Sequence, residues 1–205
     1  MMKKNKIAKL IAIAFVMTGS VPTITSAATL VNVELVSTGS SIAYNNVMAG
    51  PYVIEVDGVP IDALCDDFNT ESFVGQTWQA WLYSPAEIAA GAGKFASEGM
   101  YEEIGWLFGQ TDSMTSYEQA RAQSAIWNMT GAGPVLDVLA TSYFTQATDG
   151  THNAFNPNMW VLTANPLGAS QEFLLKIPQV PLPASVWLFG AGFLGLVGVA
   201  RVHNS

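Results

Sequence analysis

The chain contains little cysteine, little histidine and little charge. Its 205 residues include one cysteine, Cys65, and two histidines, His152 and His203, and only 12% are charged. A single cysteine excludes an intramolecular disulfide and a cysteine-rich zinc site. A hydrolase built on Cys65 and His152 would need an orienting Asn or Asp, and no cysteine-hydrolase signature surrounds Cys65. We therefore expect no enzyme activity, no metal and no cofactor.

Basic residues are scarce in the middle of the chain. Residues 28–183 contain sixteen acidic residues but only three basic ones, Lys94, Arg121 and Lys176, which gives a formal charge of −13. Such a surface repels phosphate backbones, so the composition argues against nucleic acid as a partner.

The N-terminus has the pattern of a secretory signal. Lysines at positions 3, 4, 6 and 9 precede an uncharged apolar run over residues 10–17, and Thr25, Ser26 and Ala27 form a small-x-small site. The apolar run is shorter than the roughly 20 residues of a membrane span. This pattern predicts a signal peptide over residues 1–27, with cleavage before Ala28 and export of the rest.

A second apolar segment lies near the C-terminus. Residues 184–200 are uncharged and rich in glycine, Arg201 follows them, and a proline-rich stretch at 178–183 precedes them. A run of this length lies at the short end of the spanning range of about 17–25 residues, and a basic flank favours the cytoplasmic side. We expect an extended linker over 178–183 and a transmembrane segment with a short basic end over 184–205.

The string VPLPASVWLFGAGFLGLVGVAR, residues 180–201, resembles the PEP-CTERM sorting signal of exopolysaccharide-producing Gram-negative bacteria. Pro181, Leu182 and Pro183 correspond to its proline motif, and Arg201 corresponds to its basic end. The resemblance implies that an exosortase, a membrane protease, removes the tail. The protein would then be anchored transiently in the inner membrane before it reaches the cell surface or extracellular matrix.

Residues 28–177 have the pattern of one folded domain. Alternating or β-rich segments at 28–36, 41–44, 52–56, 59–65, 73–83, 159–163 and 171–177 predict strands, and Asp57-Gly58 predicts a hairpin turn. Capping boxes at Ser84/Glu87 and Thr115/Glu118 predict helices after residue 84 and over 116–129. Helical spacing adds 97–109 and 134–144, and 146–158 is expected to be a loop. The predicted class is α+β, an antiparallel β-sandwich or barrel-like assembly with a helical insertion.

Cys65 is unusual because a lone cysteine in an exported protein is free, oxidisable or otherwise engaged. The segments ALCDD at 63–67 and AQSAIW at 122–127 resemble the two halves of a bacterial thioester domain, and the likeness extends over about residues 51–131. The resemblance implies that Cys65 and Gln123 form an internal thioester, with Leu64, Asp66, Ile126 and Trp127 around it. It also implies adhesion or matrix attachment to a surface polymer.

Alternatives to this interpretation remain open for each residue. Cys65 is equally compatible with a small buried hydrophobe, and Gln123 and Trp127 with ordinary helix packing, since residues four apart share a face. The scaffold can also persist without the bond. Asp66 and Asp67 are expected to be solvated or capping, and His152 to be exposed. The alternative function is a structural or glycan-binding matrix component that uses exposed aromatics such as Trp78 and Trp81.

Overall fold

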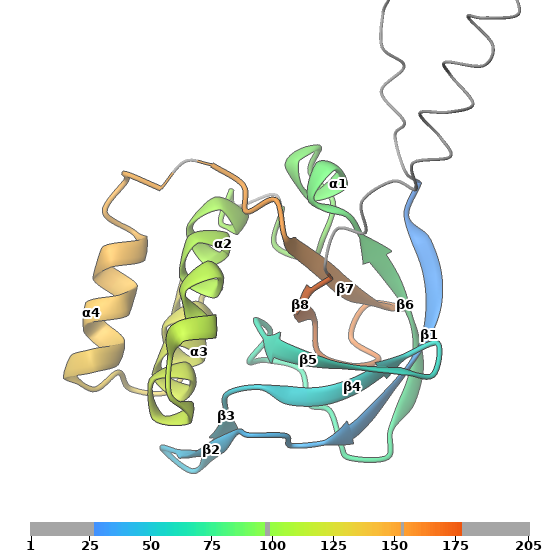
Figure 1. The fold of residues 1–205 in the computed structure, drawn as a ribbon, viewed down its shortest axis with the longest axis horizontal. Helices are drawn as coiled ribbons and strands as arrows, with labels where there is room; N and C mark the ends of the chain where they lie inside the picture. The colour runs from blue at the N-terminus through green and yellow to red at the C-terminus, as the bar shows by residue number, and fades with distance from the viewer. Residues whose placement is uncertain (1–26, 97–98, 153, 178–205) are drawn as a thin grey trace, which may run out of the picture.

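A closed antiparallel β-barrel forms the body of the protein. The computed structural model describes residues 27–96, 99–152 and 154–177. The strands are β1 (Thr29–Ser37), β4 (Tyr52–Val56), β5 (Val59–Cys65), β6 (Thr77–Tyr83), β7 (Met159–Asn165) and β8 (Phe173–Lys176). They close in the order β1-β4-β5-β8-β7-β6, and a separate hairpin pairs β2 (Ile42–Tyr44) with β3 (Val47–Ala49) (Figure 1). The predicted α+β class is confirmed, with a barrel as its β part.

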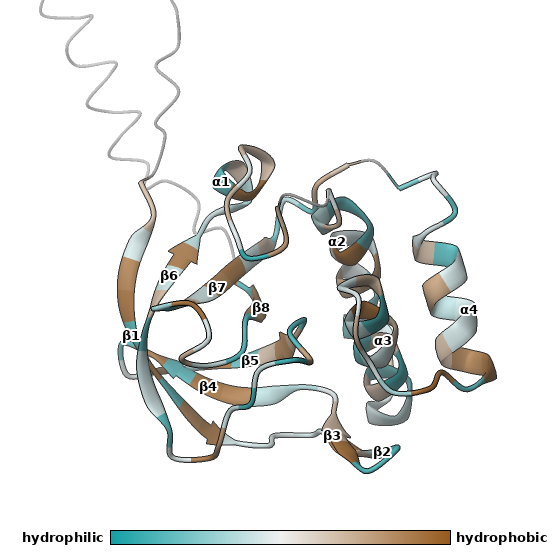
Figure 2. Cartoon of the chain, turned by 180° about the vertical axis from the view of Figure 1, so that it is seen from behind, coloured by the Kyte–Doolittle hydropathy of each residue, from teal (hydrophilic) through white to brown (hydrophobic). Residues whose placement is uncertain are grey.

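Side-chain alternation explains why these segments form a barrel. In β4, Tyr52, Ile54 and Val56 are buried, whereas the residues between them are partly exposed. Because successive side chains of a strand point to opposite faces, the buried residues fill the barrel interior and the residues between them are more exposed to solvent on the outer face. Hydrophobic and hydrophilic residues alternate visibly along β1 in Figure 2.

The helices lie between β6 and β7 in the sequence and to one side of the barrel (Figure 1). They are α1 (Pro85–Ala89), α2 (Tyr101–Gln110), the 3-10 turn η2 (Thr111–Ser113), α3 (Ser116–Met129) and α4 (Val138–Ala147). Both predicted capping boxes are present, with Ser84 and Thr115 accepting from the backbone of Glu87 and Glu118. The helical insertion is confirmed, and α3 has the predicted bounds.

Two hydrophobic clusters hold these parts together. One fills the barrel and includes Cys65, Phe173 and, from α3, Ala120 and Trp127. The other lies between the helices and the barrel and includes Leu64, Leu174 and Ile126. Helix α3 therefore contributes one set of side chains to the barrel interior and another set to the helical layer. This double role fixes its position relative to the end of β5.

Several predicted boundaries were wrong. β6 begins at Thr77 and not at residue 73, because Gln76 N donates to the Phe73 carbonyl in a turn. α2 begins at Tyr101 and not at residue 97, since Gly99 has a φ of +68° that a helix cannot accommodate. α4 is displaced to Val138–Ala147 because Asp137 caps it, and the predicted loop therefore begins after Ala147.

The β2–β3 hairpin was only half predicted. The predicted strand over 41–44 corresponds to β2, whereas β3, which is equally short, was not predicted. Its turn residues, Asn45 and Asn46, have φ values of 48° and 64°, as a primed turn requires. The same turn chemistry was predicted correctly at Asp57-Gly58, whose φ values are 49° and 81°.

No helix within residues 27–177, as far as they are described, is long and apolar enough to cross a membrane. Almost all of the predicted signal peptide, and the whole linker, sorting motif and C-terminal segment, lie outside the described residues. Those expectations therefore remain predictions.

Candidate functional site

Cys65 is the last residue of β5 and points into the barrel. It is 0% exposed and pairs with Phe173 of β8. Its sulfur accepts hydrogen bonds from Trp127 Nε1 at 3.4 Å and from the backbone N–H of Asp67 at 3.3 Å, and its thiol can donate to the Asp67 carbonyl at 3.3 Å. Burial raises the pKa of the Cys65 thiol well above its usual value, and the neighbouring Asp66 charge adds to this. The free sulfur is therefore a neutral thiol at neutral pH.

Gln123 lies on α3 and is also 0% exposed. Its side-chain oxygen, Oε1, accepts from the backbone N–H groups of Gly50 at 3.3 Å and of Cys65 at 3.4 Å. Its side-chain nitrogen, Nε2, is buried without a hydrogen-bond partner among the described residues. Buried amides are normally satisfied, so this orphaned nitrogen requires an explanation. The carboxamide is thus held only through its carbonyl oxygen, with the Cys65 backbone as one of the two donors.

Tyr52 of β4 forms another wall of this site. Its hydroxyl donates to the Met48 carbonyl at 2.5 Å. Burial raises the pKa of Tyr52 to about 12, and the neighbouring Cys65 acts in the same direction; the nearby Gln123 side chain, which lies outside hydrogen-bond geometry, opposes the shift. Tyr52 therefore stays protonated over the physiological range and serves as a neutral hydrogen-bonding group.

The structure brings together three of the six predicted residues: Cys65, Gln123 and Trp127. Leu64 and Ile126 belong to the helical cluster and not to the barrel cluster that holds Cys65 and Trp127. For Leu64 the reason is strand alternation, which turns its side chain to the face opposite that of Cys65. The shielding of the sulfur by these two side chains therefore stays a prediction, and both pack in the helical cluster. Phe68, whose ring lies 5.1 Å from that of Trp127, was missed because it lies beyond the strand.

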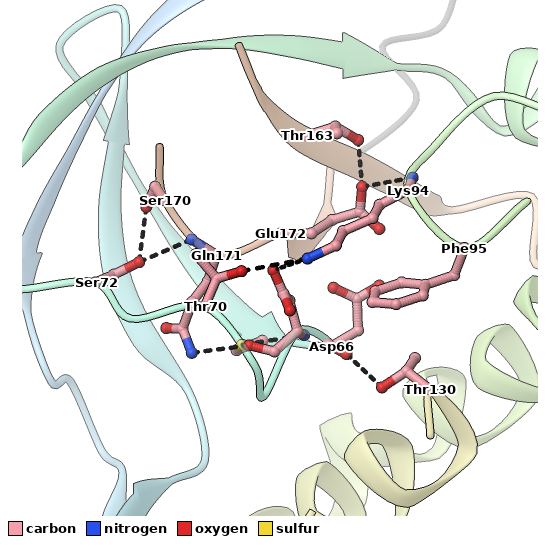
Figure 3. Close-up of polar contacts among 12 residues, drawn as sticks. Asp66, Thr70, Ser72, Lys94, Phe95, Thr130, Thr163, Ser170, Gln171 and Glu172 are labelled. Atoms are coloured by element: carbon pink, nitrogen blue, oxygen red, sulfur yellow. Dashed lines mark hydrogen bonds and ion pairs between the residues drawn. The ribbon is translucent and has the colours of Figure 1, made fainter. Parts of the chain in front are cut away.

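Asp66 and Asp67 are fully buried, contrary to the expectation that they are solvated. Asp67 forms an ion pair with Lys94, Nζ to Oδ2 at 2.5 Å, and Lys94 Nζ also donates to Thr70 (Figure 3). The backbone carbonyl of Asp66 accepts from the Thr130 hydroxyl at 2.8 Å. These contacts fasten the segment that follows β5 to the α1–α2 loop and to the end of α3.

Glu172, at the start of β8, completes this buried polar cluster. Its carboxylate accepts from the hydroxyl of Thr163 and from the Lys94 backbone N–H at 2.9 Å (Figure 3). It also accepts from the hydroxyl of Tyr101. Burial raises the pKa of Asp66 well above its usual value, and the charge of Glu172 raises it further. Burial also raises the pKa of Glu172, although its hydrogen bonds oppose the shift. Two carboxyl groups in one dry site disfavour each other's ionisation.

Other predicted residues have structural environments. His152 is half-buried, not exposed, and stacks on Trp106 with ring centroids 3.9 Å apart. Trp78 is buried in the barrel and stacks on Phe173, whereas Trp81 is half-buried. The glycan-binding alternative thus loses Trp78 as an exposed aromatic. Within the described part of the chain, no group of three or more His, Cys, Asp or Glu could hold a metal ion.

Comparison with known proteins gave one distant structural match. No family model and no curated protein matches the chain. Among solved structures, it is similar to the N-terminal thioester domain of a surface protein from Clostridium perfringens, with a TM-score of 0.45 and 14% sequence identity. The match covers 72% of this chain and 98% of that one. A likeness this distant does not assign the chain to a family.

Proposed function

We propose that Cys65 and Gln123 form an internal thioester, and that the protein is an exported surface or matrix protein that uses this bond for covalent attachment. The observation that carries the proposal is the state of the Gln123 carboxamide. Two backbone N–H groups bind its oxygen, one of these donors belongs to Cys65 itself, and its buried nitrogen has no hydrogen-bond partner in the part of the chain that the structure describes. A glutamine that served only in packing would have both ends of its amide satisfied.

The hydrogen bonds around Cys65 and Gln123 suit both reacting groups, the attacking sulfur and the carbonyl that it attacks. The Cys65 sulfur attacks the Gln123 side-chain carbon, a C–S bond forms, and the C–N bond breaks. The thiol proton leaves with the amide nitrogen as ammonia, so the atoms balance. The N–H groups of Gly50 and Cys65 lie where negative charge develops on the oxygen, as in an oxyanion hole. Trp127 Nε1 and the Asp67 N–H stabilise charge on the sulfur.

The product would be a stored acyl group. An incoming amine or hydroxyl of a partner attacks the carbonyl carbon, the C–S bond breaks, and the sulfur recovers a proton as a free thiol. Complete burial of Cys65 and Gln123 protects the bond from hydrolysis until a partner is present. The reaction occurs once per molecule, so the protein acts as an attachment module and not as an enzyme.

Delivery is part of the same proposal. A signal peptide over residues 1–27 would export the chain, and an exosortase would act at Pro181-Leu182-Pro183 before releasing the domain to the surface or matrix. The large acidic excess of residues 28–183 is compatible with a domain that stays soluble outside the cell.

Methylamine labelling tests the reactive bond. We expect the purified protein to gain one methylamine and to release one titratable thiol at the same time. Cys65→Ala and Gln123→Ala should abolish both changes, whereas Gln79→Ala, which removes an exposed glutamine of β6, should retain them. Free alkylation of Cys65 in the native wild type, without methylamine uptake, would contradict the proposal. A non-covalent matrix component would then be the better interpretation.

A further inference from the structure

A recess of about 440 Å³ opens beside the Cys65–Gln123 pair. Tyr52 and Trp127 lie among its lining residues and form what we call its floor; Met48, Phe73 and Val74 form its rim, and Glu71 supplies its one carboxylate. The rim residues are 39%, 63% and 58% exposed, which makes this an apolar opening on the surface of the domain.

The floor of the recess connects it to the reacting atoms. Trp127 donates through Nε1 to the Cys65 sulfur, and Tyr52 lies close enough to Cys65 and Gln123 for both to affect its pKa. Cys65 and Gln123 themselves are 0% exposed, so no external group reaches them without displacing a neighbour. Phe68, which packs on Trp127, also lines the recess. A group that enters the recess would therefore have to displace one of these rings to reach the bond.

Charge distinguishes which nucleophile the recess favours. Glu71 is exposed and is the only charged residue among those that line it. The three basic residues of the described ranges each form an ion pair: Lys94 with Asp67, Arg121 with Asp137 and Lys176 with Asp112. The domain therefore presents an acidic surface, which attracts cationic groups. The two lysines of the described ranges are both engaged in these ion pairs.

We propose that this recess is the access route to the Cys65–Gln123 bond, and that Glu71 selects a primary amine, carried on an apolar protein surface, over the hydroxyls of a polysaccharide. This inference rests on the proposed thioester. The ammonium group is drawn to Glu71 and loses a proton to solvent. The neutral amine attacks the carbonyl carbon, the C–N bond forms as the C–S bond breaks, and Cys65 becomes a thiol.

Blocking the opening tests the route. Val74→Trp places a bulky ring at the rim, and Val59→Trp is the matched control, because Val59 is 59% exposed at the start of β5, outside the recess. The probe is a lysine derivative blocked at its α-amine, and adduct formation is followed by intact mass. We expect Val74→Trp to slow adduct formation about tenfold or more, since misplacing a nucleophile slightly is costly. Equal rates in the two variants would overturn the route.

Removing the carboxylate tests the selection. Glu71→Gln should slow the reaction with the lysine probe about two- to fivefold, as expected for one partly screened ion pair. It should leave the rate with hydroxylamine, which is uncharged near neutral pH, unchanged. Glu55→Gln, on β4 and outside the recess, makes the same change in net charge and should leave both rates unchanged. Equal effects of the two glutamine variants would overturn the role of Glu71.

The two proposals fail in different ways. If the wild type carries the thioester but reacts with glycerol as readily as with the lysine probe, only the selection of amines is wrong. If the wild type lacks the thioester altogether, the proposed function and this inference both fail.

Discussion

At the scale of single residues, two N–H groups serve the proposed reaction in complementary ways. Gly50 donates its backbone N–H to the Gln123 oxygen, and Trp127 donates its indole N–H to the Cys65 sulfur. Both groups are buried, so each bond is stronger than it would be in water. Substitutions at these two positions therefore distinguish an effect on the stability of the domain from an effect on thioester formation.

Gly50→Ala should destabilise the domain and reduce the fraction of protein that carries the thioester. Gly50 has a φ of +115°, and an added Cβ would lie 3.1 Å from the Ser41 Cα. Gly58→Ala is the control, because Gly58 also has a positive φ, +81°, but has open space around it. We expect Gly58→Ala to cost about 1 kcal/mol in unfolding free energy, and Gly50→Ala about 1 kcal/mol more. Equal costs in denaturant unfolding, with full thioester in both variants, would contradict this role of Gly50.

Trp127→Ala should reduce the free energy of unfolding by about 3–5 kcal/mol, since the indole is 2% exposed and packs within the barrel cluster. Trp127→Phe retains most of the packing but loses the N–H donor to Cys65, so it should cost less stability while still weakening thioester formation. Urea unfolding and intact mass measure the two effects. A loss below about 0.5 kcal/mol in the alanine variant would mean that the side chain is at the surface.

At the scale of elements, the C-terminal end of β5 and the N-terminal end of β8 meet in a buried polar cluster. Its residues are Asp66, Asp67, Lys94, Tyr101 and Glu172. These residues come from three separate segments: the end of β5, the α1–α2 region and the start of β8. Burial raises the pKa of both Asp66 and Glu172, because it disfavours two charges in one dry site. The cluster positions the chain immediately after Cys65, so its protonation is linked to the stability of the site.

The stability of the domain should fall as the pH rises. The pKa values of Asp66 and Glu172 are raised in the folded state, so their contribution is fully present below the unfolded-state pKa of about 4. It is lost as the pH rises through the folded-state values, because the unfolded chain releases the protons first. Asp66→Asn should flatten this dependence in urea unfolding across a pH series. Asp62→Asn, at an exposed position of β5, should not, and identical slopes for the two variants would contradict the raised pKa of Asp66.

The sequence predicted the elements whose signals are local. The capping box at Thr115 and Glu118 fixed the start of α3, and Asp57-Gly58 fixed the β4–β5 turn, because each depends on a few adjacent residues. The burial of Asp66 and Asp67 was not predictable in this way, since Glu172 and Lys94 are distant in the sequence. Gln123 and Cys65 were identified by resemblance, whereas Gly50, the second donor to the Gln123 oxygen, was not identified.

At the scale of the whole molecule, a strongly acidic domain lies between two apolar terminal segments. Residues 28–183 have a formal charge of −13, whereas five of the eight basic residues of the chain lie outside them. This distribution is compatible with the prediction that the terminal segments direct export and membrane anchoring while the acidic domain lies between them. Delivery and attachment would then depend on separate parts of the chain.

Deletion of residues 178–205 should release the domain from the membrane without unfolding it. The described residues form both hydrophobic clusters among themselves, so we expect the domain to fold without the tail. We expect the deleted form in the soluble exported fraction with its N-terminus near Ala28, and the full chain to lose its tail after Pro183 in a host with an exosortase. Fractionation and terminal peptide mapping measure both. Recovery of the deleted form only as aggregate would show that the tail belongs to the fold.

The central claim is that Cys65 and Gln123 are covalently joined in the resting protein. The intact mass of the untreated protein tests it most directly, because forming the thioester removes one ammonia. We predict a mass lower than that of the processed sequence by one ammonia, with the deficit absent in Cys65→Ala and Gln123→Ala. A full sequence mass in freshly purified wild-type protein would contradict the account.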